Sequence, residues 1–80
     1  MNEATIGKRI AALRRERGLT QSELAETLGV SAQAVSKWET DTAYPDITLL
    51  PTLADELGTM VDGILRPDVV AETRYVPAEE

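Results

Sequence analysis

No cysteine, histidine or phenylalanine occurs in this chain of 80 residues. Without Cys and His, thiol and imidazole catalysis, Cys/His metal sites and a disulfide-dependent fold are excluded. No apolar run approaches the roughly 20 residues that span a bilayer, and the amino-terminal residues lack the apolar centre of a signal peptide. The sequence also carries no phosphate-binding loop and no activated nucleophile. We therefore expect a soluble cytoplasmic protein that is not an enzyme and requires no cofactor or metal.

The residues that are present suit a small helical domain. Apolar residues make up 42% of the chain, with a single Trp, so the core must consist mainly of Leu, Ile, Val and Ala. Eighty residues allow one domain with a modest core. Such a composition favours an all-α fold of packed helices.

The first third of the chain carries the pattern of two amphipathic helices. Apolar residues recur at the spacing of one helix face and predict a helix from Ile6 to Glu16. Thr20, followed three residues later by Glu23, forms a capping box and should begin a second helix. Gly29 ends that helix, because glycine readily adopts the left-handed backbone found there.

A third helix is predicted from Ala32 to Glu39, with Ser31 as its cap. Val35 and Trp38 lie three residues apart and should pack inward. The opposite face carries small and polar side chains, namely Ala32, Gln33, Ser36 and Lys37. Two short helices joined by a turn, the second with a polar face, form the layout of a helix-turn-helix that offers its second helix to the DNA major groove.

Residues 40–46 should form a loop before a fourth helix from about Thr48 to Leu57. Pro51 sets this start, since proline is tolerated only in the first turn of a helix, although Asp46 is a rival cap. The predicted core stripe of this helix is Leu50, Leu53, Ala54 and Leu57.

A short fifth helix is predicted from Met60 to Leu65, with Thr59 and Asp62 at its start. Its inward residues should be Val61, Ile64 and Leu65. Beyond it, the weak alternation in residues 67–80 allows either a short strand that pairs with a second subunit or a disordered acidic tail. We expect two regions, a domain over residues 1–66 and this tail.

The polar face of the third helix has the side chains that direct reading of DNA requires. Gln33 and Lys37 are four residues apart and share a helix face. Glutamine pairs with adenine and lysine with guanine, Ala32 is small enough to touch a thymine methyl, and Ser36 can bond to a base or a phosphate. Taken alone, the same pattern is typical of a solvated face; its place after a capped helix and a glycine turn favours DNA contact.

Two further residues are predicted to bind phosphates. Gln21 lies at the start of the second helix, where free N–H groups and the helix dipole favour an anion. Thr40 follows the third helix directly. The net charge of −6 is unusual for a DNA-binding protein, but residues 1–39 carry +1 and residues 40–80 carry −7. Non-specific affinity should therefore be weak and sensitive to salt.

Residues 5–66 resemble the phage repressor and Cro-type helix-turn-helix, also called the xenobiotic-response-element family. The matching segments are Leu19-Thr20-Gln21, Leu24-Ala25, Leu28-Gly29-Val30-Ser31, Val35-Ser36-Lys37-Trp38-Glu39, Pro45-Asp46-Ile47 and Leu49-Leu50-Pro51. The resemblance implies a compact five-helix, lambda-repressor-like domain.

The resemblance also implies roles for individual residues. It places base contacts at Ala32, Gln33 and Lys37, and phosphate contacts at Gln21 and Thr40. It pairs Arg14 with Glu39 as a structural link between the first and third helices. Where the family often has glycine, this chain has Asp41, whose charge should lie near the DNA backbone, and the loop 40–46 lacks the Lys and Arg of many relatives.

We predict a homodimeric DNA-binding protein of the XRE family that binds a near-palindromic operator and acts as a repressor or otherwise regulates transcription. Its dimer surface should comprise the fifth helix, a solvent-facing Leu49 and the tail. One alternative is an antitoxin or phage regulator whose acidic tail binds a protein partner. Another is a protein-interaction module that has lost its affinity for DNA; the acidic charge and Asp41 favour it.

Overall fold

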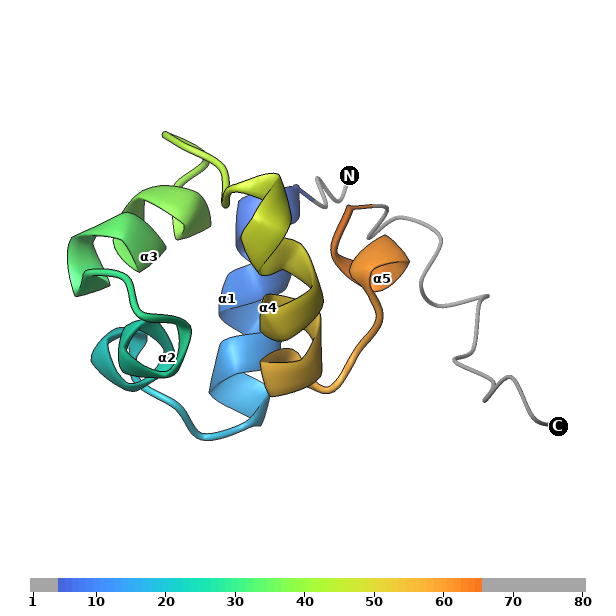
Figure 1. Ribbon diagram of the computed structural model, residues 1–80, viewed down its shortest axis with the longest axis horizontal. Coiled ribbons are helices and arrows are strands. Elements are labelled where there is room, and N and C mark those ends of the chain that lie inside the picture. The colour runs from blue at the N-terminus through green and yellow to red at the C-terminus, as the bar shows by residue number, and fades with distance from the viewer. Residues whose placement is uncertain (1–4, 66–80) are drawn as a thin grey trace, which may run out of the picture.

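The computed structural model describes residues 5–65, and these form an all-α domain without strands (Figure 1). The elements are α1 (Ile6–Glu16), α2 (Gln21–Leu28), α3 (Ala32–Glu39), the 3-10 turn η1 (Ile47–Leu49), α4 (Leu50–Leu57) and α5 (Val61–Leu65). In Figure 1, α2 and α3 lie at the left and α5 at the right, with α1 behind α4. The all-α, five-helix prediction is confirmed.

Short-range side-chain bonds determine where the first three helices begin. Thr5 accepts from the Lys8 amide at the start of α1. Thr20 and Glu23 form the predicted capping box at α2, with bonds of 2.9 and 3.0 Å in the two directions. Ser31 caps α3 by accepting from the Ala34 amide. The caps predicted at α2 and α3 are therefore confirmed.

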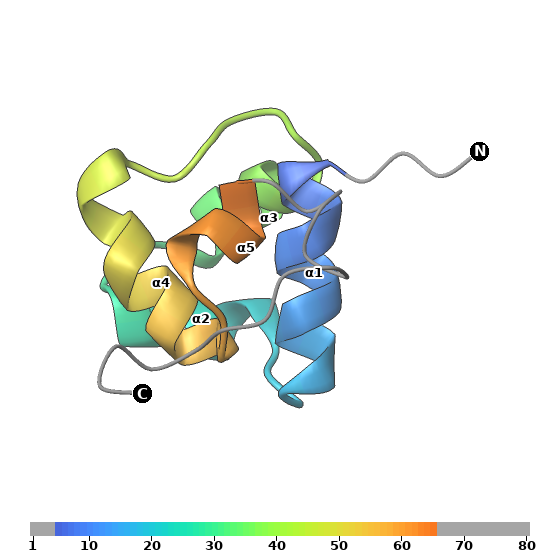
Figure 2. The same ribbon diagram turned by 90° about the vertical axis from the view of Figure 1, so that its right-hand side faces the viewer.

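Gly29 ends α2 with φ of 74°, in the left-handed region that favours glycine. The turn it creates brings the chain back so that α3 packs across α2. Figure 2, turned by 90°, shows α4 and α5 in front of this pair, with α1 alongside.

One apolar core joins all five helices. It contains Ile10, Leu13, Leu24, Ala25, Leu28, Val35, Trp38, Leu50, Leu53, Ala54, Leu57 and Ile64. The predicted inward positions of α3 and α4 all belong to it. Because Val35 and Trp38 hold one side of α3 in this core, its other side must face outward.

The start of the fourth helix differs from the prediction of Thr48. The chain enters through η1, in which the Leu49 amide donates to Asp46 O and the Leu50 amide to Ile47 O, each three residues back. Pro51 has no N–H to donate to a carbonyl four residues earlier. The α-helical hydrogen bonds therefore do not extend back into this segment, and α4 begins at Leu50. The Asp46 carboxylate caps no backbone amide and instead accepts from the Thr48 hydroxyl, at 3.1 Å.

Two predicted side-chain positions after α3 are wrong, and helix geometry explains both. Leu65 is 44% exposed, because Ile64 faces the core and the next residue turns about 100° away from it. Leu49 does not face solvent but packs against the core, whereas Ile47 is 76% exposed. The tighter 3-10 turn places Leu49 on the inner side. The tail predicted over residues 67–80 lies outside the described residues.

Candidate nucleic-acid interface

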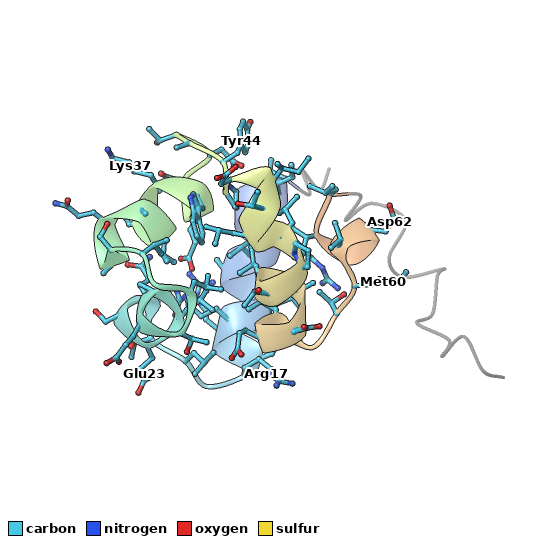
Figure 3. The ribbon with its side chains drawn as sticks, in the orientation of Figure 1. Arg17, Glu23, Lys37, Tyr44, Met60 and Asp62 are labelled. Atoms are coloured by element: carbon cyan, nitrogen blue, oxygen red, sulfur yellow. The ribbon has the colours of Figure 1, made fainter. Side chains whose placement is uncertain are left out.

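The outward face of α3 carries the predicted base-reading residues. Gln33 and Lys37 are exposed and Ser36 is half-buried. Lys37 points away from the body of the domain in Figure 3. Ala32 departs from the expected outward placement, since it is half-buried and packs against the core as the first residue of α3. The structure thus presents Gln33 and Lys37 together on one open surface, with Ala32 at its edge.

An ion pair between helices fixes the end of α3. Arg14 of α1 donates to Glu39 through Nε (2.6 Å to Oε2) and Nη2 (3.1 Å to Oε1), and through Nη1 to Leu19 O at 2.8 Å. The two side chains are only 12% and 6% exposed. The predicted Arg14–Glu39 pair is present, and its two-pronged geometry allows little rotation of one helix against the other.

The pair shifts both ionisation equilibria toward the charged forms. The hydrogen bond to Glu39 raises the pKa of Arg14 above its ordinary value, against the opposing effect of burial. Burial raises the pKa of the Glu39 carboxyl, but the hydrogen bonds from Arg14 and Gln21 and the positive charges of Arg14 and Arg15 together outweigh this, so the pKa lies below its ordinary value. Both groups are therefore ionised at neutral pH.

Gln21 belongs to the same network. Its Nε2 donates to Glu39 Oε1 at 2.9 Å, so the first residue of α2 is tied to the last residue of α3. The amide nitrogen has a second hydrogen that this bond leaves available. The first two amides of α2, those of Gln21 and Ser22, lie beyond the reach of any carbonyl within the helix. Sequence reasoning missed the bond to Glu39, which spans 18 residues.

The Asp41 side chain forms a hydrogen bond between the end of α3 and the start of α1. Asp41 has a backbone φ of 62°, and its Oδ1 accepts from the Gly7 amide at 2.9 Å. A Cβ on Gly7 would meet Trp38 O and would lie 2.9 Å from Glu39 O, so the two backbones approach closely enough to require glycine. The carboxylate expected near the DNA backbone is thus held against the positive end of α1.

Thr40 lies at the predicted place, just past α3. Its hydroxyl is 3.1 Å from Ser36 O, 3.3 Å from Lys37 O and 2.9 Å from the Thr42 hydroxyl. The side chain is exposed but already has hydrogen-bonding partners within the protein.

Within residues 5–65, no cluster of acidic side chains could hold a metal ion. Nor is any helix of this segment long and apolar enough to cross a membrane.

Together, these features define a helix-turn-helix domain whose second helix is anchored on one side and open on the other. The helix-turn-helix family model matches residues 10–63, and the chain belongs to this family. It is 39% identical over 61 residues to the immunity repressor protein of Bacillus phage phi105, covering 76% of this chain and 42% of the relative. It is 36% identical over 60 residues to the transcriptional activator BcrR of Enterococcus faecalis, covering 75% and 29%. The chain therefore spans less than half the length of these two relatives.

Solved structures of similar fold include two bound to DNA. The P22 c2 repressor in complex with a synthetic operator has a TM-score of 0.77 and 31% identity, covering 80% of this chain and 97% of that one. SinR of Bacillus subtilis in complex with DNA has a TM-score of 0.69 and 34% identity, covering 75% and 97%. The lambda-repressor-like fold is thus shared with phage and bacterial regulators.

Proposed function

We propose that this domain binds double-stranded DNA in a sequence-specific manner and regulates transcription as a repressor. The observation that carries the proposal is the open face of α3, where Gln33 and Lys37 project side by side while Val35 and Trp38 are held in the core. A helix so placed can enter the major groove and bring both side chains to base edges. The DNA-bound repressors among its structural relatives support the same function.

In this function, the residues divide into those that specify and those that position. Lys37 donates to guanine and Gln33 pairs with adenine, while Ala32 touches a thymine methyl at the edge of the surface. Ser36, which is half-buried, bonds to a base or a phosphate. Gln21 and the first amides of α2 bind one phosphate, and the turn that contains Thr40 binds another.

We further propose that the protein acts in the cytoplasm as a homodimer and has no enzymatic activity. Two copies of α3 would enter successive major grooves about 34 Å apart on a near-palindromic operator. The dimer surface includes α5 and Ile47, because Ile47 and Leu65 expose large apolar side chains whereas Leu49 does not. The division into a domain over residues 1–66 and an acidic tail over residues 67–80 is part of this proposal.

A protein partner is a second proposal. A SinR/SinI protein complex has also been solved, and the chain matched in it is 33% identical to this one. The acidic charge of residues 40–80 gives the present protein a means of attracting a basic partner. We favour such a partner as an addition to DNA binding, and not an interaction module in place of it.

Selection of bound oligonucleotides from a random pool tests the main proposal. We expect a near-palindrome with two half-sites one helical turn apart, and an affinity for it that falls steeply as salt is raised. Binding to genomic DNA should be weak at physiological salt. Enrichment of no sequence, together with no binding at low salt, would contradict the proposal and favour the interaction module.

A further inference from the structure

The turn after α3 uses all its backbone donors internally. The amides of residues 40–43 donate to carbonyls in the last turn of the helix: Thr40 to Ser36 O, Asp41 to Trp38 O, and Thr42 and Ala43 to Lys37 O, at 2.9–3.2 Å. A phosphate near this turn therefore finds no free backbone N–H among these four residues. Loop 40–46 also contains no Lys or Arg, so a hydroxyl must supply any bond made from residues 40–43.

The Thr40 hydroxyl has one proton and three neighbouring acceptors within the protein. Ser36 O and Lys37 O lie at 3.1 and 3.3 Å, and Thr42 Oγ1 lies at 2.9 Å. Whichever of these the proton serves, it is committed internally. Thr40 can donate to DNA only by giving up the bonds that hold its own side chain.

Thr42 stands in a different position. Its side chain is exposed, and its hydroxyl has one described partner, the Thr40 oxygen. We propose that the Thr42 hydroxyl donates a hydrogen bond to a DNA phosphate at the end of α3. Thr40 lies behind it as a positioning residue. This inference rests on the proposed DNA binding and deepens it by naming the atom that meets the backbone.

The contact costs little free energy, because the two hydroxyl protons can rotate together. When the Thr42 proton turns outward to a phosphate oxygen, the Thr40 proton can turn to Thr42 Oγ1. Ser36 O and Lys37 O remain satisfied because each already accepts a backbone amide. The resulting chain, from Thr40 to Thr42 to phosphate, polarises the outer hydroxyl and strengthens its bond to the anion.

The experiment uses the full chain and the operator obtained by selection, with Thr42→Val as the main variant. Valine keeps the shape and replaces the hydroxyl with a methyl group. We expect an affinity about tenfold weaker, the usual cost of one hydrogen bond to a charged group. Because a neutral donor displaces no counterion, the dependence of affinity on salt should keep its slope. Thr42→Ser, which restores the hydroxyl, should bind within about threefold of the wild type.

Two matched variants separate this role from a structural one. Thr40→Val should weaken binding less than Thr42→Val, since Thr42 keeps its proton for the phosphate. Thr27→Val is the control: the Thr27 hydroxyl also bonds to the carbonyl four residues back, but it lies at the far end of α2 from Gln21. It should bind like the wild type. Thermal melting of every variant checks that the fold is retained.

Replacing single operator phosphates by neutral methylphosphonates gives the second readout. At one position per half-site, the replacement should weaken the wild type and leave Thr42→Val unchanged. Wild-type affinity in Thr42→Val, or a larger loss in Thr40→Val, would overturn the inference while leaving DNA binding intact. A wild type that selects no operator would instead overturn the proposed function, and this inference with it.

Discussion

The two halves of the domain are held together in different ways. The helix-turn-helix half, α1 to α3, is held by hydrogen bonds between side chains that are far apart in sequence. Glu39 accepts three of them. The half formed by α4 and α5 joins it through buried apolar side chains such as Leu53, Leu57 and Ile64. Apolar contact is strong but not directional, whereas hydrogen bonds fix orientation. The comparison indicates that α4 and α5 supply stability and that the polar network sets the geometry of the reading surface.

The largest expected effect is on stability, from Leu53→Ala in α4. Leu53 is fully buried where α4 meets the other helices, and its truncation leaves a cavity. We expect a loss of about 3 kcal/mol in the free energy of unfolding, measured by urea denaturation. At low temperature, the fraction that remains folded should bind the operator with unchanged preference. A changed base preference would show that the apolar half also sets the reading geometry.

Arg14→Met tests the polar half. Removing the cation leaves the Glu39 carboxylate largely buried, with Gln21 as its one remaining described hydrogen-bond partner and the Arg15 charge nearby, which should cost about 2 kcal/mol of stability. The double variant Arg14→Met with Glu39→Leu should recover most of this loss, since no unpaired charge remains. It should still bind the operator poorly, because Gln21 and α3 have lost their link. Wild-type affinity in the double variant would show that the ion pair contributes nothing to recognition.

A smaller effect on stability is expected when the pH is lowered. The pKa of Glu39 is lowered in the folded state, so its ionisation stabilises the fold above its unfolded pKa, and this contribution is lost as the pH falls through the folded pKa. The difference in melting temperature between the wild type and Glu39→Gln should therefore be largest near neutral pH and shrink as the pH falls to about 3. A difference that is constant over this range would contradict the role given to the charge.

Local patterns made most of the fold predictable. The bounds of α1, the caps Thr20 and Ser31 and the stop at Gly29 all depend on residues within one turn of each other. The start of α4 was misplaced because the apolar residues before Pro51 suit a 3-10 turn as well as the first turn of an α-helix. Leu65 was misplaced because the predicted helix, Met60 to Leu65, is too short for periodicity to fix a face.

The candidate site was predictable only in part. The open placement of Gln33 and Lys37 follows from the burial of Val35 and Trp38 on the other side of one helix. The Arg14–Glu39 link, across 25 residues, came from family resemblance, since no short-range pattern carries it. The contact of Gly7 with Asp41 spans 34 residues and went unpredicted for the same reason.

The most direct test of the account is the affinity of Lys37→Ala for the selected operator and for variants of it at each base pair. The exposed Lys37 should read one guanine, so the substitution should cost about 1–3 kcal/mol of binding free energy and abolish preference at that single position. The stability of the fold should not change. Equal weakening on every sequence would reduce Lys37 to a phosphate contact, and unchanged binding would contradict the claim that this face of α3 reads DNA.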